Sequence, residues 1–138
     1  MTRADGMAAI RAEREPRVYL AGPMRRYPEF NHPAFHQAAR LLRAEGYEVF
    51  SPAEHDIAMG LDVTGTTGDP AELAGFSLRE ALGAGLAWIT ARADAVVTLP
   101  GWEASLGACA EVAAARALGL PVWELGPVLA ALDRGAAL

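Results

Sequence analysis

The segment LPGWEASLGACAE, residues 99–111, places one carboxylate among small side chains just after a turn. On a helix that begins near Glu103, the face that carries Glu111 is otherwise made of small residues, namely Ala104, Gly107, Ala108, Ala114 and Ala115. These side chains leave room for a ligand to lie against the backbone. Apolar surroundings are expected to raise the pKa of a half-buried carboxylate, unless a hydrogen-bond donor offsets the effect. Glu111 is therefore a candidate nucleophile.

The start of the same helix suits an anion. Ser105 and the N–H groups near Gly107 lie in the first turn, where the helix dipole favours negative charge. One short segment could thus bind a phosphate at its start and present a nucleophile further along. The plain alternative is a surface glutamate on an Ala-rich helix that packs against a sheet, because glycine-containing loops are weak signals by themselves.

The elements that must position this segment alternate between strand and helix. Buried apolar runs predict strands over residues 17–24, 47–53, 93–100 and 120–125. Helical periodicity predicts helices over residues 34–46, 78–93, 104–119 and 127–135. This alternation predicts an α/β fold, a Rossmann-like (flavodoxin-like) parallel sheet of four or five strands with helices on both faces.

The organisation of the chain is expected to be simple. Residues 17–138 are expected to form a single domain, preceded by a flexible N-terminal tail over residues 1–16. Residues 57–77 are rich in Gly, Thr and Asp and form the one long irregular segment, which is typical of a lid or binding loop and sometimes of a disordered one.

Two turns are placed where a parallel sheet binds ligands, beyond the carboxyl ends of its strands. They are AGPMRR, residues 21–26, after the first strand, and PGWEASLG, residues 100–107, after the third. Both contain glycine and both lead toward a helix. We expect them to meet at one cleft.

Composition narrows the classes of function. Of the 138 residues, 52% are hydrophobic and 21% charged, which is typical of a globular protein, and the net charge is −5 without a basic run. These features argue against long nucleic acid as a partner. No apolar run is long enough to span a bilayer and no signal peptide is evident, so we expect no membrane association and a cytoplasmic location.

Cysteine and histidine give no metal or disulfide signal. The single Cys109 excludes an intrachain disulfide and is interpreted as a small core residue. His32 and His36 have a spacing that could hold a metal, but no third ligand lies nearby in sequence. They are interpreted as solvated helix residues, and neither a metal nor a cofactor is predicted.

Two spaced motifs carry a resemblance to a known family. They are Y-x-x-G-x-x-R, formed by Tyr19, Gly22 and Arg25, and S-x-G-x-x-x-E, formed by Ser105, Gly107 and Glu111. From Arg17 onward the chain resembles the nucleoside 2-deoxyribosyltransferase-like superfamily, which includes the 2'-deoxynucleoside 5'-phosphate N-hydrolases. The stretches YLAGPM, SPAEHD and LPGWEAS are most similar to a small phage and bacterial branch.

The resemblance implies roles for these residues. Glu111 would attack C1' of the sugar of a nucleoside or nucleotide, and Tyr19 would position that carboxylate. The 5' end or its phosphate would be held by Ser105, Gly107 and the loop with Arg25. The substrate-binding residues expected on this basis are Gly22, Pro23, Met24, Arg25, Trp102, Ser105 and Gly107, with Trp102 either stacking on a base or forming the wall of the site.

One position departs from the family. The resemblance places a general acid, an Asp, where this chain has Gly85, which cannot transfer a proton. Losing one acid or base typically costs about 10²–10⁴-fold in rate. Replacements to consider are Asp56, Glu54 and Glu103, each of which is also a common turn or cap residue. We expect Gly85→Asp to restore a proton donor.

Three hypotheses follow. The first is an N-glycosidase or deoxyribosyltransferase that cleaves the N-glycosidic bond of a (deoxy)nucleoside or its 5'-monophosphate through a glycosyl-enzyme intermediate on Glu111. The second is a nucleotide-binding or sensor protein with weak or no catalysis, and the third is an interaction protein that kept only the fold. A homodimer is expected, because the PVLAAL segment, residues 127–132, is too apolar to lie exposed.

Overall fold

The computed structural model describes residues 3–136, which surround one parallel sheet. Its four strands are β1 (Arg17–Ala21), β2 (Glu48–Phe50), β3 (Ala95–Thr98) and β4 (Val122–Glu124), in the order β2-β1-β3-β4. All pairs are parallel, and every residue of β3 and all but the first of β1 are buried. Burial on both faces explains the continuous apolar runs of these strands. The predicted Rossmann-like α/β sheet is confirmed.

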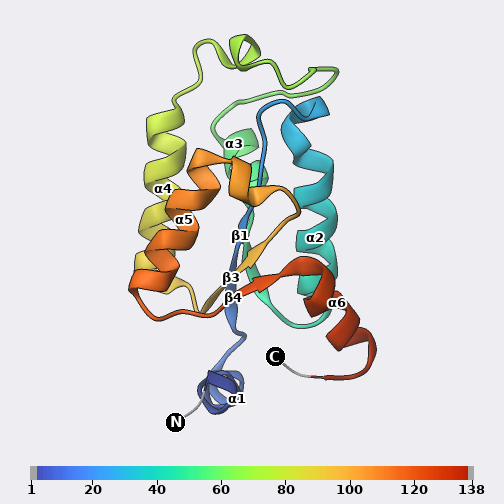
Figure 1. Cartoon of the computed structure of the whole chain (residues 1–138), viewed down its shortest axis with the longest axis vertical. Coiled ribbons are helices and arrows are strands. Elements are labelled where there is room, and N and C mark those ends of the chain that lie inside the picture. The colour runs from blue at the N-terminus through green and yellow to red at the C-terminus, as the bar shows by residue number, and fades with distance from the viewer. Residues whose placement is uncertain (1–2, 137–138) are drawn as a thin grey trace.

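Helices cover both faces of this sheet (Figure 1). Helices α2 (His32–Ala44) and α6 (Leu125–Asp133) lie on one side, and α4 (Leu78–Arg92) and α5 (Leu106–Ala117) lie on the other. The long segment between α3 (Pro52–Ala58) and α4 crosses the end of the sheet at which the strands finish. It contains one short 3₁₀ turn, Pro70–Leu73, and is otherwise irregular, as expected.

Alternation along β1 divides the core into two layers. Val18 and Leu20 point toward α2 and α6, whereas Tyr19 and Ala21 point toward α4 and α5. The first layer also contains the large side chains of Phe35 and Leu42. The second layer combines Tyr19 with Ile89, Val112 and two alanines of α5. A single strand therefore supplies both an apolar core and the floor of the candidate site.

The structure differs from the sequence-based expectation at residues 52–58. The second strand was expected to extend to residue 53 and the irregular segment to begin at residue 57, but residues 52–58 form α3, with Pro52 in the first helical turn directly after Ser51. The sequence reading missed it because the helix is only 7 residues long and has no extended apolar periodicity.

The N-terminal segment also differs, because α1 (Arg3–Glu13) occupies most of the expected tail. Met7 is buried, and Arg14 forms a salt bridge of 2.7 Å with Asp94. Asp94 also accepts a hydrogen bond of 2.7 Å from the backbone N–H of Arg17, so this residue connects α1 to the starts of β1 and β3.

Helix α6 removes the physical reason for expecting a homodimer. Its Val128 and Leu132 are buried in the same core layer as α2. The apolar character of residues 127–132 therefore serves this chain's own core and requires no partner. Among residues 3–136, no helix combines the length and the apolarity that crossing a membrane needs.

Candidate active site

The two predicted turns meet because β1 and β3 are neighbours in the sheet. Ala21 pairs with Thr98 at the ends of these strands, and Leu99 N donates a hydrogen bond of 2.9 Å to Ala21 O. Gly22 follows, and a Cβ there would lie 2.7 Å from the Cβ of Leu99, so only glycine allows this approach. Both turns line one pocket of about 590 Å³.

Glu111 and Tyr19 form a buried pair in this pocket. Glu111 projects from the second turn of α5, and its Oε2 accepts a hydrogen bond from the Tyr19 hydroxyl. Glu111 is 8% exposed and Tyr19 is 1% exposed. Burial is the main reason why the pKa of Glu111 is raised to about 7. The hydrogen bond from Tyr19 lowers this pKa, and the negative charge of Asp56 raises it further. The predicted upward shift of this pKa agrees with the structure.

Gly85 lies directly against this pair. Helix α4 passes so close that a Cβ at position 85 would fall well under 3.0 Å from the Tyr19 hydroxyl oxygen and 3.1 Å from Glu111 Oε2. Position 85 is therefore beside Glu111, where the resemblance places the general acid of the family. Gly85→Asp would therefore place a carboxyl group beside Glu111 only if the buried Tyr19 side chain shifts, and the expectation that it restores a proton donor stays a prediction.

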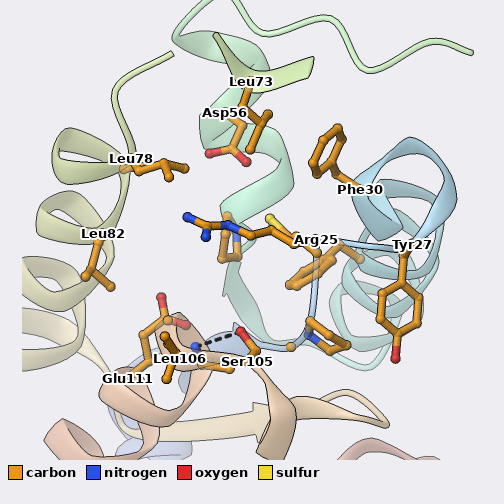
Figure 2. Close-up of a pocket in the computed structure, with 18 of the residues that line it drawn as sticks. Arg25, Tyr27, Phe30, Asp56, Leu73, Leu78, Leu82, Ser105, Leu106 and Glu111 are labelled. Carbon is orange, nitrogen blue, oxygen red and sulfur yellow. Dashed lines mark hydrogen bonds between the residues drawn. The ribbon is translucent and has the colours of Figure 1, made fainter. Parts of the chain in front are cut away.

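Ser105 and Arg25 border the pocket from the two turns. Ser105 is the N-cap of α5, and its Oγ accepts a hydrogen bond of 3.2 Å from Ala108 N. Arg25 extends from the first turn into the middle of the cavity, between Asp56 and Glu111 (Figure 2). The other residues expected to bind substrate from these turns, Gly22, Pro23, Met24 and Gly107, also line the pocket.

Asp56 is the second carboxylate of the pocket. It lies on α3, is 5% exposed, and its Oδ2 is 3.5 Å from His32 Nε2. His32 is itself 2% exposed, so the expectation that it is a solvated helix residue is wrong. The first turn of α2 packs against α3, which places the ring behind Asp56. His36 is exposed, as expected.

Three further residues considered from the sequence lie outside the lining of the pocket. Glu103 is exposed on the 3₁₀ turn Trp102–Ala104, and Glu54 is paired with Arg43 at 2.6 Å. Trp102 packs against the core layer of α4 and α5, with the Arg116 guanidinium 5.8 Å from its ring centroid. Asp56 is thus the only one of the three carboxylates considered as replacement acids that reaches the cavity.

The long segment before α4 forms the roof. Leu61, Pro70, Leu73 and Phe76 line the pocket from it. Backbone hydrogen bonds from Arg26 N to Gly68 O, 2.8 Å, and from Glu29 N to Thr66 O, 3.0 Å, hold this segment against the first turn. That turn is strained, since Arg26 and the residues 29–31 all have positive φ without being glycine. Phe30 could not be predicted in the wall of the pocket from the sequence, because its orientation depends on this backbone.

Comparison with known proteins places the chain in a family. No curated protein matches the chain significantly. Residues 16–124 match the family described as "Domain of unknown function (DUF4406)", and this range contains Tyr19, Gly85 and Glu111. Because the match spans most of the chain, the protein belongs to the DUF4406 family.

Proposed function

We propose that this protein is an N-glycosidase or 2-deoxyribosyltransferase that acts on a nucleoside or its 5'-monophosphate. The observation that carries the proposal is the buried Tyr19–Glu111 pair inside a pocket at the carboxyl ends of β1 and β3. A retaining reaction at an anomeric carbon needs one carboxylate that can attack C1' and stabilise oxocarbenium character. Glu111 meets both needs.

The hydrogen bond from Tyr19 gives the two carboxylate oxygens of Glu111 different roles. Tyr19 donates to Oε2, which fixes the plane of the carboxylate and leaves Oε1 available for attack on C1'. Water would then hydrolyse the glycosyl-enzyme intermediate, or a second base would capture the sugar. Because the pKa of Glu111 is about 7, the ionised form grows as the pH rises through this value. We therefore expect activity to rise across the same interval.

The rest of the pocket is consistent with a nucleotide. Arg25 offers a guanidinium inside the cavity, and the N-terminus of α5 at Ser105 offers a positive dipole end. The motifs that resemble the nucleoside 2-deoxyribosyltransferase-like superfamily, Tyr19/Gly22/Arg25 and Ser105/Gly107/Glu111, all contribute to this one pocket. This coincidence supports the proposed substrate class, and we propose that the DUF4406 domain is related to that superfamily.

A second candidate function is nucleotide binding without efficient turnover, for example in a sensor. The observation that favours it is Gly85, which leaves no proton donor beside Glu111 on α4. Asp56 is the other carboxylate in the lining and is the candidate acid if one is needed.

Release of free base tests the proposal. The protein is incubated with a panel of nucleosides and 5'-monophosphates, in ribose and deoxyribose forms, with and without an acceptor base, and the products are separated by chromatography. We expect base release or exchange that Glu111→Gln abolishes. Glu80→Gln is the matched control, because Glu80 is exposed at the start of α4 and lies outside the lining. Binding without release would favour the sensor, and full activity of Glu111→Gln would contradict the role of Glu111.

A further inference from the structure

The wall that α4 gives to the pocket has no group that can donate a proton. Its lining residues are Leu78, Ala81 and Leu82, all apolar. Gly85 follows one turn later, where a Cβ would meet the Tyr19 hydroxyl, and it has no side chain that could donate a proton. A base that leaves on this side of Glu111 therefore meets only hydrocarbon and backbone.

The buried charged groups that line the pocket are both acidic. Glu111 and Asp56 are 8% and 5% exposed, and they face each other across the cavity (Figure 2). The negative charge of Asp56 reaches the other side, where it raises the pKa of both Glu111 and Tyr19. The lining also contains Arg25 and Arg26, which are exposed overall, although the guanidinium of Arg25 lies between the two carboxylates (Figure 2). Two buried carboxylates against this one guanidinium leave the interior of the pocket acidic, and the carboxylate in excess complements positive charge.

Aromatic rings form another part of the wall. Phe50 stacks with Tyr19 at a centroid distance of 5.2 Å and with His55 at 5.7 Å, and all three line the pocket. This stack gives a flat, apolar wall on the side of the cavity that also carries Asp56. A planar base can pack against this wall, and a positive charge on the base would be attracted by the nearby carboxylates.

We propose that the substrates are nucleosides or nucleotides whose base already carries a positive charge on its ring system, such as an N7-alkylated purine or a pyridinium. This inference rests on the proposed function and names its substrate class. Such a base needs no proton in order to leave. For such a substrate, the lack of a general acid at position 85 does not slow the reaction.

The chemistry balances without an acid. Glu111 Oε1 donates an electron pair to C1' and forms the C1'–O bond, while the C1'–N bond breaks and its electron pair neutralises the ring nitrogen. The base departs neutral. Water then attacks C1', the C1'–O bond to Glu111 breaks, and the water proton passes to solvent, which restores the carboxylate. A cation next to Glu111 also favours its ionised form, so the substrate itself helps to generate the nucleophile.

Matched substrate pairs test this inference. One pair is 7-methylguanosine and guanosine, and the other is nicotinamide riboside and its uncharged dihydro form. Each pair is supplied as riboside and 2'-deoxyriboside, with and without a 5'-phosphate, and enzymatic base release is measured after subtraction of the spontaneous rate. We expect kcat/KM at least about 100-fold higher for the charged member, since a missing acid penalises only the neutral one.

The outcomes separate the inference from the proposed function. If the charged and neutral members are cleaved within about 10-fold of each other, and Glu111→Gln abolishes both activities, the proposed function stands and the inference is overturned. That result would assign the proton to Asp56 or His55. If no member of any pair is cleaved but the nucleoside panel gives base release that Glu111→Gln abolishes, the inference is overturned and the proposed function stands. If the panel gives no base release either, the proposed function fails and the inference fails with it.

The variant Asp56→Asn provides a second test. Because it compares KM with kcat for two substrates of the same protein, its result does not depend on a change in stability. If Asp56 stabilises a cationic base, the variant raises KM for the charged member by about 10-fold and leaves kcat nearly unchanged. If Asp56 were a general acid, the variant would lower kcat for the neutral member and leave the charged one unaffected, which would contradict the inference. Asp133→Asn, an exposed position on α6, is the control for the loss of one carboxylate.

Discussion

The two faces of the sheet use the same strands for different purposes. On the face covered by α2 and α6, large apolar side chains such as Phe35 and Leu42 fill the space between helix and sheet. On the face covered by α4 and α5, Ala108 and Ala115 pack beside Ile89 and Val112, and Gly85 lies next to Tyr19. Glu111 projects from α5 on this second face, whereas Asp56, the other buried carboxyl group of the pocket, lies on α3 beside His32 of α2.

This difference indicates how a parallel sheet can hold a buried acid. Small residues let α4 and α5 approach the strand closely, and the resulting layer excludes water from Glu111 without filling the space in front of it. Burial is the largest cause of its raised pKa. The α2/α6 face therefore contributes stability, whereas the α4/α5 face gives up part of its stability to bury the carboxyl group of Glu111.

The largest effect on stability is expected from Leu42→Ala on the α2/α6 face. Leu42 is 1% exposed, and removing a buried leucine side chain typically lowers the free energy of unfolding by about 2–5 kcal/mol. Chemical denaturation measures this change. Leu118→Ala, at a position that is 49% exposed, should change the same quantity by less than about 0.5 kcal/mol. Equal losses at the two positions would contradict the assignment of the core.

The pH dependence of stability should show the effect of burying Glu111 on the α4/α5 face. The pKa of Glu111 is raised from 4.5 to about 7 on folding, so the folded state binds more protons than the unfolded state between these values. Stability should therefore fall as the pH rises through this window, by about 3 kcal/mol in total. In Glu111→Gln the free energy of unfolding should no longer decrease across this window, as measured by urea denaturation from pH 4 to pH 8. The same slope in both proteins would show that Glu111 is not buried as described.

Two glycines of α4 allow a matched comparison. A Cβ at Gly83 would meet nothing within 4 Å, so Gly83→Ala should stabilise the helix by up to about 1 kcal/mol. Gly85→Ala should instead destabilise by about 2 kcal/mol, because the Cβ forces the buried Tyr19 to move. It should also disrupt the hydrogen bond to Glu111. If both variants stabilise the protein equally, α4 does not approach the site as closely as the structure shows.

The smallest effect is expected from Tyr19→Phe. The hydrogen bond of Tyr19 lowers the pKa of Glu111, so its removal should move the midpoint of the Glu111 titration above about 7. Stability at pH 8 should fall by about 1 kcal/mol, since the ionised carboxylate loses its donor. The side-chain carboxyl chemical shift of Glu111 as a function of pH measures the midpoint. A midpoint that falls or stays constant would contradict this pairing.

The fold could be predicted from the sequence because its signals are local and periodic. The apolar runs of β1 and β3 and the glycines of the two turns were sufficient to place the pocket at the carboxyl ends of these strands. Glu111 could be singled out because small residues precede it on its helical face. These features depend on neighbours within a few positions of the chain.

Other features depend on contacts that spacing does not encode. His32 is buried because α2 packs against α3, a helix too short to be predicted. Glu103 was a candidate acid because of its position in the sequence, but the 3₁₀ turn directs it to solvent. The fit between Gly85 and Tyr19 joins residues 66 positions apart, and only the packing of α4 shows that a Cβ at position 85 would meet the Tyr19 hydroxyl.

The central claim is that Glu111 forms a glycosyl-enzyme intermediate. Its most direct test is the mass of the protein after reaction with a substrate analogue that traps this intermediate. A nucleoside with fluorine at C2' destabilises the oxocarbenium-like transition state that hydrolysis of the intermediate requires, and so should allow a glycosyl-enzyme to accumulate. Charged and neutral bases are both used as leaving groups. We predict that intact mass spectrometry shows the addition of one fluorinated sugar, which peptide mapping assigns to Glu111 and which is absent from Glu111→Gln. Base release without any adduct on Glu111, or an adduct on another residue, would contradict the account.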